Sequence, residues 1–264
     1  MRECLIGAGL LGAAANVIMQ LSRPGVGYGV LESTVDSGKL FLHPIKRFRT
    51  TVSYLAVASA GTEAERRAYR RAVDRSHVPV RSTAASPVTY SAFDHDLQLW
   101  VAACLYRGFH DNYRMFVGTL DDEDAETLYA GCARLGTTLQ VPSERWPADR
   151  AAFDRYWADA LSAVRADEPV RDYLETLLRL RFLPRPVSLL FGPIHSFITV
   201  GYLPPPFREA MRLRWDDSRQ RRFDRVIAGV AFLVRLTPGP VRRFPYNAAL
   251  WDVRRRIKKG RPLV

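Results

Sequence analysis

The chain has 264 residues, of which 47% are hydrophobic, and it carries a formal net charge of +12. A chain of this size buries one sizeable core, and no composition break or long polar linker divides it, so we expect a single domain. Its three cysteines, an odd number without CxxC spacing, argue against a disulfide framework and against a zinc site.

An apolar stretch rich in small residues covers residues 5–19. The stretch is too short to span a bilayer. The only basic residue before it is Arg2, and the acidic Glu3 comes directly after Arg2, so the segment predicts neither a transmembrane helix nor a convincing signal peptide. We expect it to be the first buried helix, ending near Gln20 before Pro24. The expected localisation is cytoplasmic, either free or peripherally attached to a membrane.

Residues 62–76 have the pattern of a helix. Thr62 and Glu65 are spaced for a capping box, and apolar residues then recur at steps of three and four. Pro79 disfavours a helical conformation in the residue before it, so the helix is expected to stop near His77. His77 continues the apolar stripe, which consists of Ala68, Tyr69, Ala72 and Val73.

The position of His77 supports two interpretations. An imidazole at the end of a buried helical face is well placed to bind a metal. A histidine in the last turn also interacts favourably with the carbonyl end of a helix without any cofactor. The periodicity of the segment does not decide between them.

Further helices are expected downstream. Asp94 and Asp121 are each placed to cap the start of one, and Pro169 occupies the first turn of another. Residues 182–206 are apolar but punctuated by prolines, which favours short helices and turns. A longer helix is expected over residues 216–236, where apolar residues again recur at helical spacing.

The other histidines are less suited to bind a metal. His195 has apolar neighbours, which favours a hydrogen-bonded core histidine over a second ligand. His110 follows Gly108, which is expected to end a helix. No histidine, His43 and His95 included, shares an apolar face with another, so a cluster of histidines and carboxylates around a metal is not supported.

Basic residues are concentrated late in the chain, which we divide into a helical domain at residues 1–240 and a basic tail at 241–264. Such a tail is attracted to an anionic membrane surface by about 1 kcal/mol per basic residue. It lacks the interleaved aromatics of a single-strand binder, and no nucleic acid partner is expected. A solvated, disordered end is the alternative. The basic residues of the tail are Arg242, Arg243, Arg254, Arg255, Arg256, Lys258, Lys259 and Arg261.

The order of features along the chain resembles the MpaB-type oxygenase family, which includes the catalytic domain of rubber oxygenases (latex clearing proteins). The resemblance extends from a turn containing proline and glycine at residues 21–30 to a Gly-Tyr-Leu-Pro turn at 201–204. Between them it rests most heavily on Arg47, Thr51, Gly61, His77, Val80, Tyr90, Ala92, Asp94, Trp100 and Val101.

The resemblance implies an all-α, single-domain helical bundle that encloses a haem pocket. The histidine of the His-x-x-Val element, here His77, is then the proximal ligand of the iron in haem b. Arg47 and Thr51 match a pair on the distal side of the haem, and their i, i+4 spacing puts both on one helical face. Such a pair offers a fixed positive charge and a hydroxyl to dioxygen.

Two features separate the chain from the rubber-cleaving branch of that family. The branch can carry a lysine that reaches the iron where this chain has Thr50, which predicts iron that is five-coordinate or bound to water at rest. Glu32 lies upstream of Arg47, where the branch has an acidic residue proposed as a base, but a surface glutamate after a Gly-rich turn is the simpler interpretation. Rubber is therefore not assigned as the substrate.

Two functions are compatible with these features. The first is a haem-dependent oxygenase in which His77 holds the iron, Arg47 and Thr51 act on dioxygen, and the substrate is a hydrophobic, unsaturated lipid- or isoprenoid-like molecule. The second is a non-catalytic basic helical protein that docks on an anionic membrane surface or nucleic acid, with His77 merely closing a helix.

Overall fold

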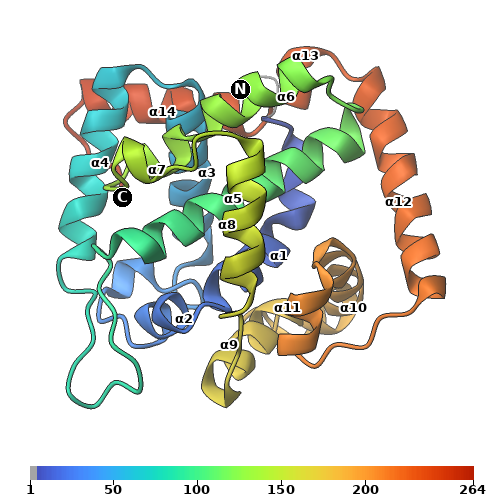
Figure 1. Ribbon diagram of the computed structural model, residues 1–264, viewed down its shortest axis with the longest axis horizontal. Coiled ribbons are helices and arrows are strands. Elements are labelled where there is room, and N and C mark those ends of the chain that lie inside the picture. Colours follow the sequence, from blue (N-terminus) through green and yellow to red (C-terminus); the bar gives the residue numbers. More distant parts are fainter. Residues whose placement is uncertain (1–4) are drawn as a thin grey trace.

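The computed structural model describes residues 5–264 and is all-α, as predicted (Figure 1). No strand occurs among these residues; an isolated bridge between Arg81 and Ser91 is their only β-type pairing. The first part of the chain forms η2 (Gly7–Gly12), α1 (Ala13–Leu21), α2 (Pro24–Leu31), η3 (Asp36–Gly38), α3 (Pro44–Ala60), α4 (Glu63–His77), α5 (His95–Phe116), α6 (Asp122–Cys132) and α7 (Arg134–Thr137). The rest forms η4 (Ser143–Arg145), α8 (Arg150–Leu161), α9 (Glu168–Leu178), α10 (Arg185–Tyr202), α11 (Pro205–Ala210), α12 (Asp217–Leu236), α13 (Gly239–Arg242) and α14 (Tyr246–Lys258). The η elements are short 3-10 helices.

Helix α5 crosses the middle of the molecule and contacts α1, α7 and α12 (Figure 1). Its Trp100 is almost fully buried and stacks on Trp157 of α8, with 5.2 Å between the ring centroids. The indole Nε1 of Trp100 donates a hydrogen bond to the carbonyl of Gln20 at the end of α1, at 3.1 Å. Trp100 of α5 therefore holds both α1 and α8 in place.

The predicted helix starts are confirmed by their caps. Thr62 and Glu65 form both halves of a capping box at the start of α4. The Asp94 carboxylate accepts backbone hydrogen bonds at the start of α5, and Asp121 does the same for α6. Caps of this kind each contribute about 1 kcal/mol and depend only on residues three positions apart, so they can be recognised in the sequence.

The prediction that a helix ends at Gly108 is wrong, because α5 continues to Phe116. A Cβ at Gly108 would lie 2.6 Å from Nδ2 of Asn16 on α1. That nitrogen donates a hydrogen bond to the carbonyl of Cys104, at 2.6 Å. The glycine therefore serves the close approach of α1 and α5, and it does not end the helix.

The short helices and turns expected over residues 182–206 are also wrong, because α10 runs without a break from Arg185 to Tyr202. Pro186 lies in the first turn, where the backbone needs no N–H donor, and Pro193 removes only one hydrogen bond from the interior. The helix packs against α1, α9 and α12, and this packing outweighs the local effect of the prolines. In the part of the chain that the structure describes, no helix combines the length and the apolar character that crossing a bilayer requires.

Residues 241–264 are not a solvated, disordered end. They include the end of α13 and all of α14, and α14 packs along α3 (Figure 1). The side chains of Tyr246, Leu250, Val253 and Leu263 are buried in the same core as those of α3. Arg254 also forms an ion pair with Glu65 of α4, with 2.7 Å between the charged atoms.

Candidate functional site

Arg47 and Thr51 lie one turn apart on the first half of α3, and both are exposed. The second half of the same helix is buried from Val52 to Ser59 and anchors it in the core. Among the described residues, neither side chain has a hydrogen-bond or ion-pair partner. The two predicted site residues therefore share one face of a firmly held helix and keep their polar groups free.

His77 is the last residue of α4, as predicted. Helix α4 is fixed against α3 by the hydroxyl of Tyr69, which donates a hydrogen bond to the Thr50 carbonyl at 2.6 Å. The Nδ1 atom of His77 is buried and has no hydrogen-bond partner among the described residues. Since buried polar atoms in folded proteins are nearly always paired, this imidazole nitrogen is available to a ligand that the chain does not supply.

The structure brings Arg47 and His77 within electrostatic range of each other. Burial lowers the pKa of His77, and the positive charge of Arg47 lowers it further, while Asp74 opposes both effects. A pKa below the ordinary value near 6.5 keeps the imidazole neutral at neutral pH. The neutral form has the lone pair that a metal ligand requires.

The Arg47 side chain is in contact with solvent and also has protein atoms around it. The side chain is exposed to solvent, and yet burial lowers its pKa, with Tyr173 and Tyr69 acting in the opposite direction. Both facts hold if the guanidinium lies in an indentation of the surface, where solvent reaches it from one side only. No carboxylate of the described residues neutralises it.

Exposed apolar side chains adjoin these polar groups. Phe48 is 52% exposed and lies between Arg47 and Thr51 in the sequence of α3, and Val78, next to His77, is 64% exposed. The ring of Phe93 meets the His77 ring edge-on, with 6.4 Å between centroids, and is also exposed. An apolar group with a metal at its centre would cover surface of this kind while it engaged the imidazole.

Tyr173 of α9 is a neighbour of the site that the sequence did not suggest. It was interpretable only as a core residue of its own helix, yet its electrostatic interaction with Arg47 places it at the site. The Phe41 ring stacks on the rings of both Tyr173 and Phe182, at centroid distances of 4.4 and 5.1 Å. No sequence signal links Arg47 and Phe41 to Tyr173 and Phe182, because the two pairs lie more than a hundred residues apart.

Glu32 has structural hydrogen bonds. Its carboxylate accepts a hydrogen bond from the Tyr90 hydroxyl at 2.7 Å and another from the Ser86 hydroxyl at 2.6 Å. These bonds tie the end of α2 to the loop that follows His77. The interactions described for Glu32 do not include Arg47 or His77.

His195 is bound to the backbone. Its Nδ1 pairs with the Leu178 carbonyl at 2.9 Å, and the hydroxyl of Ser196 donates to the same oxygen at 2.8 Å. Leu178 is the last residue of α9, so both side chains satisfy a carbonyl that the helix leaves unpaired. The hydrogen bond agrees with the prediction for His195, but its expected burial in the core is wrong, because His195 is half-buried and its neighbour Ile194 is 62% exposed.

Within residues 5–264, no three histidine, cysteine or carboxylate side chains are gathered where they could hold a metal ion. A haem differs from such a site because one axial imidazole is enough to ligate its iron from the protein side. Two cavities, of about 360 and 730 Å³, lie elsewhere along α4, and neither is lined by Arg47, Thr51 or His77.

Comparison with known proteins agrees with the resemblance found in the sequence. The family described as "ER-bound oxygenase mpaB/B'/Rubber oxygenase, catalytic domain" matches residues 4–232. The chain is 52% identical over 251 residues to the uncharacterised proteins Mb2261 of Mycobacterium bovis and Rv2237 of Mycobacterium tuberculosis, with 95% of this chain and 98% of each relative covered. No solved structure matches it significantly. The chain therefore belongs to the family of mpaB and rubber oxygenase catalytic domains.

Proposed function

We propose that the chain is a haem b-dependent oxygenase that acts on a hydrophobic, unsaturated lipid- or isoprenoid-like substrate. His77 is the protein ligand of the iron, and Arg47 and Thr51 are the polar groups that act on dioxygen. The bound haem supplies the redox-active iron at which dioxygen reacts. Membership of an oxygenase family supports the reaction class.

The observation that carries this proposal is the unpaired imidazole of His77 within electrostatic range of the unpaired guanidinium of Arg47. A histidine that merely closed its helix would be expected to bind one of the last carbonyls, and the described contacts of His77 include no such bond. The site therefore offers a neutral imidazole for the iron of a haem, a positive charge nearby, and exposed apolar surface for the haem ring.

Arg47 and Thr51 contribute chemistry through their charge and hydroxyl. A guanidinium in a partly desolvated indentation interacts with a developing negative charge more strongly than one in bulk water. Arg47 has no carboxylate partner among the described residues, so its charge would be free to act on negative charge that develops beside a bound haem. The Thr51 hydroxyl, one turn along α3, can donate a hydrogen bond to the same region.

The visible absorption spectrum tests the axial ligand. Wild type, His77→Ala and His110→Ala are purified after expression with a haem precursor. We expect a Soret band in the wild type and in His110→Ala, because His110 lies on α5 beside Asp111. The band should be lost or strongly reduced in His77→Ala.

Two spectroscopic results would contradict the proposal. If none of the three proteins shows a Soret band, even after reconstitution with haem, the haem-oxygenase assignment fails and the non-catalytic alternative takes its place. A band that persists at full intensity in His77→Ala overturns the assignment of the ligand. Circular dichroism of each variant shows whether a lost band reflects a lost fold.

We also propose a peripheral membrane contact, which would give the enzyme access to a lipid-like substrate. The C-terminal half of α12 and the segment after it carry apolar side chains that are each more than half exposed. Arginines occur along the same segment, which is the composition expected of a surface that meets anionic lipid. The apolar residues are Phe232, Leu233, Leu236, Val241 and Phe244.

A further inference from the structure

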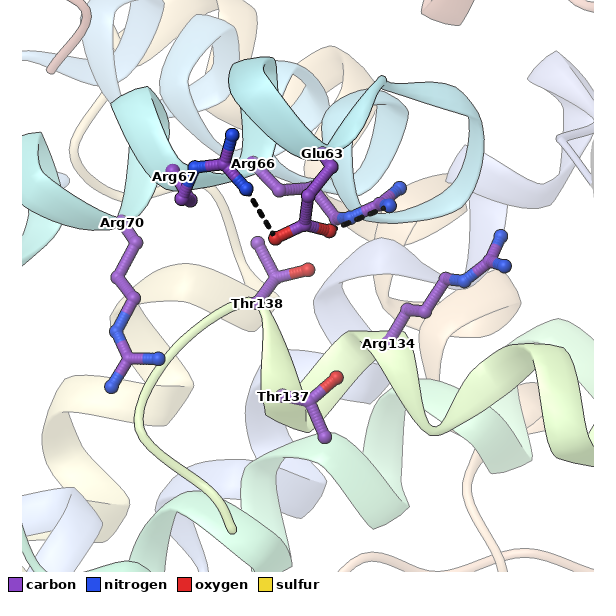
Figure 2. Close-up of a pocket in the computed structure, with 7 residues that line it drawn as sticks. All are labelled: Glu63, Arg66, Arg67, Arg70, Arg134, Thr137 and Thr138. Atoms are coloured by element: carbon purple, nitrogen blue, oxygen red, sulfur yellow. Dashed lines mark hydrogen bonds and ion pairs between the residues drawn. The ribbon is translucent and has the colours of Figure 1, made fainter. Parts of the chain in front are cut away.

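A cavity of about 360 Å³ lies between the N-terminal half of α4 and the short helix α7 (Figure 2). Four arginines contribute to its lining: Arg66, Arg67 and Arg70 from α4, and Arg134 from α7. Glu63 is the only carboxylate in the lining, so four positive charges face one negative charge. The cavity is therefore strongly cationic.

The guanidinium groups are only partly used by the protein. Glu63 pairs with Arg66 at 3.0 Å and with Arg67 at 3.2 Å, and Arg66 also donates a hydrogen bond to the Gly61 carbonyl. Arg70 reaches the carboxylate of Asp74 only at 4.0 Å. The side chain of Arg134 has no hydrogen bond or ion pair among the described residues, and its donors are free.

A buried hydroxyl provides an independent sign of a ligand. Thr138 is only 4% exposed and lines the cavity, but its Oγ1 has no hydrogen-bond partner among the described residues. Figure 2 shows this side chain extending into the space between the helices, below Glu63. Hydroxyls that are buried so deeply are usually paired. Among the unpaired buried atoms of the described residues, the Thr138 hydroxyl is the one whose residue lines this cavity, so a ligand bound there would supply its partner.

We propose that this cavity binds a phosphate-type oxyanion, either a free phosphorylated compound or the phosphate of a lipid headgroup. Guanidinium forks match the geometry of phosphate oxygens, and a hydroxyl can donate to a remaining oxygen. Glu63 and His77 stand at opposite ends of α4, about 20 Å apart at 1.5 Å per residue, so the anion site is separate from the His77 site.

Calorimetric titration with pyrophosphate at constant ionic strength tests the site. Wild-type protein is expected to bind one equivalent. Arg134→Gln is expected to weaken binding about tenfold, because it removes a charge-assisted hydrogen bond. Glu63→Gln is expected to tighten binding, because it removes the carboxylate that competes for Arg67. Arg155→Gln, which changes an exposed arginine on α8 outside the cavity, should bind like wild type.

Thr138→Val separates ligand binding from folding. The substitution conserves shape and removes the unpaired hydroxyl, so the free protein should unfold at the same temperature as wild type or higher. Pyrophosphate should nevertheless bind more weakly. The proposal fails if wild-type protein gives no saturable heat, if Arg155→Gln weakens binding as much as Arg134→Gln, or if Thr138→Val and Arg134→Gln both bind like wild type.

Two soluble probes distinguish the source of the phosphate. If dihexanoyl phosphatidic acid binds more tightly than glycerol 3-phosphate, and if this binding depends on Arg134, the site is assigned to a lipid headgroup. If glycerol 3-phosphate and pyrophosphate bind and the lipid does not bind, the site is assigned to a free phosphorylated compound. Either result supports a phosphate site in this cavity.

Discussion

At the scale of single residues, several buried polar atoms of the described residues have no hydrogen-bond partner, and two of them, in His77 and Thr138, lie within range of exposed arginines at the two ends of α4. His77 and Arg47 form one pair of neighbours near the C-terminal end of α4, and Thr138 and Arg134 form another around its N-terminal half. An unpaired buried polar atom costs about 1–3 kcal/mol, so groupings of this kind are retained where a ligand completes them. The two ends of α4 therefore mark the two candidate sites of the protein.

Substitution of Arg47 tests its role in oxygen chemistry. Arg47→Gln is expected to retain haem but to slow alkene-dependent oxygen uptake by roughly 10²-fold, the cost of removing one preorganised electrostatic group. Thr51→Val should have a smaller effect in the same direction. An oxygen electrode with squalene as the probe alkene measures both, and Arg155→Gln serves as the control. Unchanged uptake in Arg47→Gln would exclude Arg47 from the reaction.

At the scale of elements, glycines decide how closely helices approach. A Cβ added at Gly201, near the end of α10, would lie 2.1 Å from the ring of Phe223 on α12. Phe223 is almost fully buried and belongs to a small core cluster with Ile227 and Ala231 of the same helix. The absence of a side chain at Gly201 thus sets the spacing between α10 and α12.

Two matched substitutions check this spacing. Gly201→Ala forces the Phe223 ring to move and is expected to lower the free energy of unfolding by about 1–3 kcal/mol. Gly229→Ala lies within α12 where an added Cβ meets nothing within 4 Å, so it should raise the free energy of unfolding by about 0.5–1 kcal/mol. Urea denaturation followed by circular dichroism measures both, and equal effects would contradict the close approach.

At the scale of the whole molecule, positive charge and exposed apolar surface occur together late in the chain. The net charge is +12, and α12 runs along the right-hand edge of the molecule and leads into α13 at the top (Figure 1). Soluble monomers seldom expose large apolar patches unless the patch contacts a partner. The same region would both attach the protein to a membrane and hold it close to a lipid-like substrate.

Co-sedimentation with anionic vesicles tests this attachment. Leu236→Asp places a negative charge in the exposed apolar segment and is expected to weaken binding about tenfold or more, because it removes apolar contact and repels anionic lipid. Ala151→Asp adds the same charge at an exposed position on α8 and should bind nearly as wild type does. If both variants bind equally, net charge alone governs the attachment.

Features that depend on neighbouring residues were predictable from the sequence. The capping box of Thr62 and Glu65 and the caps at Asp94 and Asp121 act over three residues, and the apolar stripe that leads to His77 needs only helical geometry. The family, too, was recognisable, because an ordered series of short motifs is a property of the chain itself. The all-α class was expected from the family resemblance together with these local helical patterns.

Features that depend on distant residues were decided only by the tertiary structure. Helix α10 continues through Pro193 because its packing against other helices outweighs one lost hydrogen bond, and α14 is ordered because α3 covers its apolar face. Tyr173 lies within electrostatic range of Arg47, and Thr138 lines the same cavity as three arginines of α4, across long stretches of sequence. Local patterns determine where helices begin, whereas burial against distant partners determines how far they extend and which side chains meet.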